Sequence, residues 1–182
     1  SSSLTAVARA AIDFFDGFCR LRTLPVPVLC AAHGKVLGGD LAACLLTDFV
    51  ASDHEATFQV GERSRGIYPA GLLRRALADA IGSDAAMGLY VVDAELTCTQ
   101  AHEKGIVQMV ASSVRSTQQL AQNLALSYSS TRPVSGQGRA LSAELRVLSG
   151  ALPLAERCIL AVDAFAQARS LQAQATEPTV GH

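Results

Sequence analysis

HGKVLGGDLAACLLTD, residues 33–48, places two adjacent glycines between an apolar run and a segment of helical composition. The apolar run before it, VLCAA, ends at Ala32 and is typical of a short buried strand. Glycine weakens both strands and helices, and it is usually kept where the backbone must come close to another group. Gly38 and Gly39 therefore indicate a strand-to-helix turn that another group approaches closely.

Such a turn leaves backbone N–H groups unpaired at the positive end of a helix dipole. A site of this kind suits an anion, or a carbonyl oxygen that becomes one during a reaction. A turn that serves only tight packing fits the same two glycines equally well. The spacings of dinucleotide-binding and Walker loops are absent. Asp40 is expected to cap the helix, which then runs to about Leu46.

Composition favours one globular domain, with 182 residues, 49% of them hydrophobic, and a formal net charge of -1. Its 15 Lys and Arg residues are scattered, which argues against a nucleic-acid partner. The 5 cysteines lie far apart, so we expect neither a disulfide framework nor a metal site. There is no stretch of ~18 apolar residues and no signal-peptide pattern, so no membrane association and a cytoplasmic location are expected.

Apolar spacing predicts a helix from Leu4 to Leu24, ended by the sequence LPVP. Two strands, FVASD (49–53) and ATFQV (56–60), flank a turn. Three helices follow at 72–81, 83–92 and 98–105, and IVQMVA (106–111) is predicted as a strand. Further helices at 118–128, 139–150 and 152–169 are interrupted by a polar hinge at 130–138, and a loose tail begins at Leu171.

The order of these segments resembles the enoyl-CoA hydratase/isomerase (crotonase) superfamily across Leu24 to Ser112. Its glycine-rich strand–loop–helix, its P-E loop, its G-x-x-A helix and its A-x-x-x-G-L-V segment correspond to PVLCAAHGKVLGGD, TFQVGERSRGIYPAG, GSDAAMGLYVVD and AHEKGIV. The resemblance implies an α/β fold, a ClpP-like spiral of ββα units with a C-terminal helical trimerisation region. The N-terminal part of that fold, with its first oxyanion donor, is expected to be absent. Residues 1–112 would form the core, 113–170 the helical region and 171–182 a flexible tail.

The resemblance also implies the catalytic residues. Gly39 falls where the family has an N–H donor of its oxyanion hole, which holds a thioester oxygen as an enolate. Glu62 falls on the acidic position of the P-E loop and would act as acid/base. Residues on neighbouring motif loops are expected to contact the acyl group: Gly38, Leu37, Tyr68 and His33. Arg63 and Arg65 are expected to be solvated rather than to bind a substrate carboxylate.

Two departures from the family pattern shape the expected activity. Ala42 stands where hydratases usually carry a second Glu, and Asp40 replaces a third glycine. One carboxylate can still take an α-proton and return it to a departing hydroxyl on the same face. The sequence therefore predicts a thioester-processing lyase that dehydrates a 3-hydroxyacyl group.

GKVLGG with GIYPA looks closest to polyketide β-branching dehydratases, whose substrate is a 3-hydroxy-3-methylglutaryl group. The resemblance implies no cofactor beyond the CoA or phosphopantetheine that carries the acyl group. Its implied partners are acyl-CoA or acyl carrier protein and copies of the chain itself, as a homotrimer or a dimer of trimers. Alternatives are an enoyl-CoA isomerase or decarboxylase of the same fold, or a non-catalytic scaffold subunit.

Overall fold

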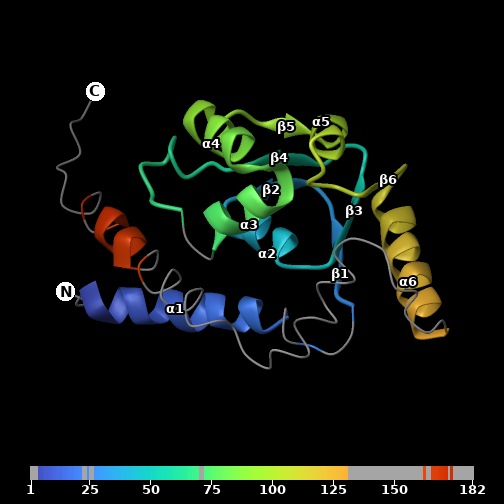
Figure 1. Ribbon diagram of the computed structural model, residues 1–182, viewed down its shortest axis with the longest axis horizontal. Helices are drawn as coiled ribbons and strands as arrows, with labels where there is room; N and C mark the ends of the chain where they lie inside the picture. The colour runs from blue at the N-terminus through green and yellow to red at the C-terminus, as the bar shows by residue number, and fades with distance from the viewer. Residues whose placement is uncertain are drawn as a thin grey trace.

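The computed structural model of the chain describes residues 4–21, 24, 27–69, 72–130, 162, 165–171 and 173. Its helices are α1 (Leu4–Arg20), α2 (Gly39–Leu45), α3 (Leu73–Ile81), α4 (Ser83–Val92), α5 (Cys98–Glu103) and α6 (Val114–Ser130). Its strands are β1 (Leu29–Ala32), β2 (Lys35–Leu37), β3 (Phe49–Asp53), β4 (Thr57–Gln59), β5 (Leu96–Thr97) and β6 (Met109–Ala111). Figure 1 shows α1 below the main body and α6 at the opposite end from the N-terminus.

Successive strands alternate between two three-stranded sheets. One sheet has the order β1-β3-β6 with parallel pairing, and the other has the order β2-β4-β5, in which β4 and β5 are antiparallel. The chain thus runs through β1-β2-α2 and then β3-β4-α3, which are two consecutive ββα units. The predicted α/β class and ββα repeat are confirmed in this part of the chain. The strands on either side of the 53–56 turn belong to different sheets and do not pair with each other.

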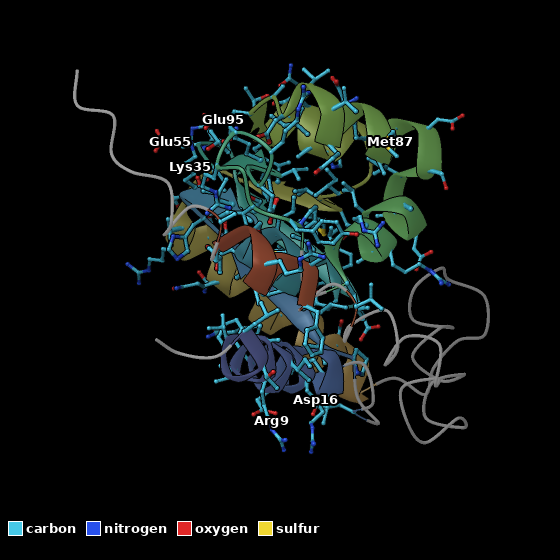
Figure 2. All side chains as sticks on the ribbon, turned by 90° about the vertical axis from the view of Figure 1, so that its left-hand side faces the viewer. Arg9, Asp16, Lys35, Glu55, Met87 and Glu95 are labelled. Atoms are coloured by element: carbon cyan, nitrogen blue, oxygen red, sulfur yellow. The ribbon has the colours of Figure 1, made fainter. Side chains whose placement is uncertain are left out.

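The core lies between the sheets and helices α2, α3 and α5. Its largest members are fully buried: Phe58, Leu41, Leu46, Leu72, Leu73 and Ile106. Phe58 on β4 is 0% exposed, and apolar burial of this kind stabilises a fold by ~25 cal/mol per Å². An ion pair joins the sheet edge at β2 to the segment before β5, since Lys35 Nζ lies 2.6 Å from Glu95 Oε2, and both labels fall together in Figure 2.

Several predicted boundaries are corrected. Helix α1 ends at Arg20 rather than at residue 24, and β6 begins at Met109 rather than at residue 106. Strands β2 and β5 were not predicted. Asp40 is not the helix cap, because α2 starts at Gly39 and Gly38 occupies the cap position without any side-chain cap bond. Asp40 lies in the first turn of α2, where its negative charge interacts favourably with the positive end of the helix dipole.

The predicted C-terminal region is described only in part. Helix α6 confirms and extends the helix predicted at 118–128, and residues 165–171 are helical, within the helix predicted at 152–169. The hinge at 130–138, the helix at 139–150 and most of the tail lie outside the described residues. The helical residues 165–171 contact the body of the structure, because the backbone N–H of Tyr68 donates to Ser170 Oγ at 3.2 Å.

Candidate active site

Glu62 lies in a tight loop directly after β4. Gly61 precedes it with φ +70, and Leu37 packs so closely on Gly61 that a Cβ there would overlap the Leu37 side chain. The loop closes on itself, because the N–H of Ile67 donates to the Glu62 carbonyl at 2.8 Å. This tight turn folds the side chain of Glu62 inward, and the residue is only 3% exposed. Glu62 is therefore a buried carboxyl group.

The group that approaches Gly38 is the side chain of Glu62, joined there by Arg65. A Cβ added to Gly38 would lie 2.7 Å from Glu62 Oε1 and 2.8 Å from Arg65 Nη2. Gly38 also has φ 57 and ψ -109, a backbone conformation that L side chains rarely adopt. Its N–H donates to the Gln59 carbonyl at 3.2 Å, which ties the start of α2 to β4. Sequence and structure therefore agree that only glycine fits here.

Burial dominates the electrostatics of Glu62 and raises its pKa to about 7, while the positive charge of Arg65 lowers it and the negative charge of Asp93 raises it. The pKa therefore lies near neutrality, where a carboxyl group can both accept and donate a proton. Its Oε2 is buried without any hydrogen-bond partner among the described residues. An unpaired buried acceptor is costly in a folded protein, and such atoms often mark a reactive site.

Asp93 is a further residue of the site, and it was not predicted from the sequence. It follows the last residue of α4 and accepts two backbone hydrogen bonds from the Glu62 loop, from Gly61 N–H at 2.5 Å and from Ser64 N–H at 2.7 Å. Its own carbonyl accepts from Gln59 Nε2 at 2.8 Å. An Asp directly after a helix, where the chain must turn through a left-handed conformation, was the available signal.

The predicted substrate-binding residues are only partly brought together. Leu37 packs on Gly61 beside Glu62. His33 is exposed and lies before β2, separated from Gly38 by Gly34 and the strand. Tyr68 is half-buried, and its ring lies 5.3 Å from the Arg74 guanidinium. The roles of these residues toward an acyl group stay predictions.

The start of α2 offers one further polar group. Gly39 is exposed and is the first residue of the helix, so its N–H has no acceptor within α2. Ala42 is 0% exposed and belongs to the core, so no carboxylate stands at that position of the helix. Arg65, although exposed overall, places its guanidinium against Gly38 and donates from Nε to the Gly61 carbonyl at 2.7 Å. Arg65 is therefore exposed, as expected, and it also contacts the glycine turn and the Glu62 loop.

The raised pKa makes the stability of the protein depend on pH through Glu62. The folded state holds this proton more tightly than the unfolded chain, whose Glu pKa is 4.5, so the stabilisation is complete below pH 4.5 and is lost as the pH rises through about 7. Gln does not titrate. The wild type therefore loses stability when the pH is raised from 5 to 8, and Glu62→Gln does not lose this contribution. Relative to the wild type, we expect the free energy of unfolding of Glu62→Gln to increase by at most about 3 kcal/mol over this pH range.

Thermal unfolding of the two proteins at both pH values checks this expectation. Glu55→Gln is the matched control, because the side chain of Glu55 is 84% exposed and lies at the surface labelled in Figure 2. The effect of the control on stability should differ much less between the two pH values, because its 4.0 Å ion pair with His54 joins two exposed side chains. An equal difference between Glu62→Gln and the wild type at pH 5 and pH 8 would contradict the raised pKa.

Among the described residues, no helix is long and apolar enough to cross a membrane. In the same part of the chain, no group of three or more His, Cys, Asp or Glu side chains could hold a metal ion. The candidate site consists of the Gly38 turn, the buried carboxyl group of Glu62 and the two charged side chains beside it, Arg65 and Asp93. This set of groups is suited to proton transfer beside a carbonyl oxygen.

Known proteins share the sequence pattern and the fold of this chain. The chain is 33% identical over 122 residues to 1,2-epoxyphenylacetyl-CoA isomerase of Escherichia coli K12. The matched segment covers 65% of this chain and 45% of that relative. An enoyl-CoA hydratase structure from Bacillus halodurans has a TM-score of 0.73 at 16% identity, covering 93% of this chain and 70% of that one. A polyketide biosynthesis enoyl-CoA hydratase structure from Bacillus subtilis has a TM-score of 0.65 at 21% identity, covering 85% and 57%.

The chain thus spans less than half the length of the curated relative it matches. The two solved structures show a shared fold alone, because their identities are low. The family model described as enoyl-CoA hydratase/isomerase matches residues 5–133, which is most of the chain. The chain belongs to the enoyl-CoA hydratase/isomerase (crotonase) family.

Proposed function

We propose that this chain processes acyl thioesters as a crotonase-type lyase, dehydrating a 3-hydroxyacyl group through an enolate. The observation that carries the proposal is Glu62: a carboxyl group that is 3% exposed, has a pKa of about 7 and leaves Oε2 unpaired beside the Gly38 turn. A pKa near the working pH lets the same group act first as base and then as acid.

The proposed reaction has two proton transfers. The Glu62 carboxylate removes the α-proton of the thioester, and the electron pair moves onto the carbonyl oxygen, where the N–H of Gly39 donates to the developing enolate. The enolate then expels the 3-hydroxyl as Glu62 returns the proton to it, so that one water leaves and a carbon–carbon double bond forms. Glu62 ends in its starting charge state.

The substrate is proposed to be a 3-hydroxy-3-methylglutaryl group on acyl carrier protein, with acyl-CoA as the alternative carrier. The resemblance of GKVLGG and GIYPA to β-branching dehydratases supports this choice, and the polyketide biosynthesis enoyl-CoA hydratase among the structural neighbours agrees with it. The proposal includes assembly as a homotrimer or dimer of trimers and a cytoplasmic location.

Isomerisation of an enoyl thioester is the second candidate function. The relative that is 33% identical is an isomerase by name, and moving a double bond also needs one carboxylate that removes and returns a proton. The two functions differ in their products, because isomerisation leaves the mass unchanged whereas dehydration removes one water.

Liquid chromatography coupled to mass spectrometry separates the candidates, because chromatography resolves the 2-enoyl and 3-enoyl esters, which have equal masses. The protein, expressed from its complete reading frame, is incubated separately with carrier-bound 3-hydroxy-3-methylglutarate, with a linear 3-hydroxyacyl-CoA and with a 3-enoyl-CoA. We expect loss of one water, fastest from the carrier-bound group. Additional loss of carbon dioxide would identify a decarboxylase, and conversion of only the 3-enoyl-CoA to its 2-enoyl isomer would identify an isomerase. No reaction with any of the three would leave the scaffold alternative.

A further inference from the structure

Asp93 adopts a backbone conformation that is unusual for aspartate. Its φ of 53 and ψ of 34 place it in the left-handed region at the end of α4, and Leu72 is the only other non-glycine residue with positive φ among the described residues. Glycine is the usual residue at such a helix end, because it adopts this conformation without steric cost. A strained residue kept in place of glycine points to a role for its side chain.

The side chain of Asp93 is fully engaged with the loop that carries Glu62. Oδ1 accepts from Gly61 N–H and Oδ2 accepts from Ser64 N–H, so the two oxygens hold the residues on both sides of Glu62. Charge-assisted bonds of this kind are shorter and stronger than neutral ones. The C-terminal end of α4 is thereby fixed to the loop, more than 25 residues away in sequence.

Asp93 is unsuited to proton transfer. Partial burial opposes its charged form, but hydrogen bonds from Ser64 and Gly61, together with the charge of Arg65, outweigh that effect and hold the pKa of the carboxyl group below its ordinary value. A carboxylate that stays ionised and accepts bonds at both oxygens neither donates nor collects a proton near neutral pH. Its remaining effect on the site is to fix the loop and to add a negative charge.

We propose that Asp93 is a positioning residue that holds Glu62 in its buried, reactive place through the N–H groups of Gly61 and Ser64. The consequence for turnover rests on the proposed function, whereas the consequences for the loop and for Glu62 itself do not. The charged groups that act on Glu62 among the described residues are Arg65 and Asp93, with opposite signs. Removing one or the other should therefore move the titration of Glu62 in opposite directions.

The experiment compares three variants with the wild type in the whole protein. Asp93→Gly keeps the backbone conformation and removes the carboxylate, and Asp93→Asn keeps one accepting oxygen and also tolerates the left-handed region. Arg65→Met removes the opposing charge. Asp84→Asn is the matched control, because Asp84 is an exposed carboxylate in the first turn of the same helix.

Two readouts do not depend on activity. Amide hydrogen exchange at Gly61 and Ser64 should accelerate about tenfold or more in Asp93→Gly, less in Asp93→Asn, and not at all in the control. The infrared band of the Glu62 carboxyl, identified by its loss in Glu62→Gln, should titrate below pH 7 in both Asp93 variants and above it in Arg65→Met. Unchanged exchange at both amides, or an unchanged Glu62 titration, would overturn the proposal.

Kinetics distinguish positioning from a structural role. With the substrate that the wild type turns over, kcat should fall about tenfold or more in Asp93→Gly and less in Asp93→Asn, with KM changed less than about threefold. A structural role would instead lower the unfolding temperature and leave kcat of the folded protein intact. If the wild type turns over no thioester, the proposed function fails, while exchange and titration still decide the role of Asp93.

Discussion

Glu62→Gln should lower turnover of the thioester substrate by a factor of about 10² to 10⁴, the range typical of losing a general acid/base. Gln has nearly the same shape as Glu, so the buried site beside Gly38 stays filled, but its amide cannot accept the α-proton. Steady-state kinetics on the purified protein measure the effect, and KM should change little because Gln keeps the same volume.

The pH dependence of the same assay adds a second requirement. If Glu62 acts as the base, kcat/KM of the wild type should rise with pH and level off above about pH 7, since burial raises its pKa to about 7. The remaining activity of Glu62→Gln should lack this rise. Activity of the variant within twofold of the wild type would refute the assignment, whereas Glu55→Gln should retain full activity because that side chain is 84% exposed.

The elements best predicted from the sequence are those with a long apolar pattern or a glycine turn. Helices α3 and α4, the strands at 49–53 and 57–59, and the turn at Gly38 all lie where their patterns indicated. Strands β2 and β5 contain 3 and 2 residues, which is too short for any alternation to be recognised. Their place in a sheet comes from pairing with β4, a tertiary contact that local sequence does not encode.

The candidate site was also predicted only in part from the sequence. Glu62 was predicted because its loop resembles a family motif, but its burial was not, because this depends on how Gly61 turns under Leu37. Arg65 and Asp93 carry no periodic signal. Asp93 reaches the loop only because α4 ends beside it, so its two hydrogen bonds follow from the assembled fold. Local patterns thus indicated the reacting group, while its electrostatic surroundings required the tertiary structure.

Gly38→Ala should abolish most activity, and Gly34→Ala should not, although both glycines have similar positive φ. Gly38 has φ +57 and Gly34 has φ +64, so both substitutions strain the backbone, by about 1–2 kcal/mol in the left-handed region. A Cβ at Gly34 would meet nothing within 4 Å, whereas one at Gly38 would lie 2.7 Å from Glu62 Oε1. The pair therefore separates backbone strain from displacement of the carboxylate.

The displaced atoms are the ends of flexible side chains, so the protein can accommodate Gly38→Ala by moving Glu62 and Arg65 rather than by unfolding. That movement removes the base from its place beside the turn, and a shift of ~1 Å in a reacting group can cost ~10²-fold in rate. Thermal unfolding and steady-state kinetics on both variants measure the two effects. Equal losses of activity in both would show that the glycines matter only for the backbone. A selective loss in Gly38→Ala, with both variants folded, would mean that the glycine is required because the carboxylate occupies the space of its missing side chain.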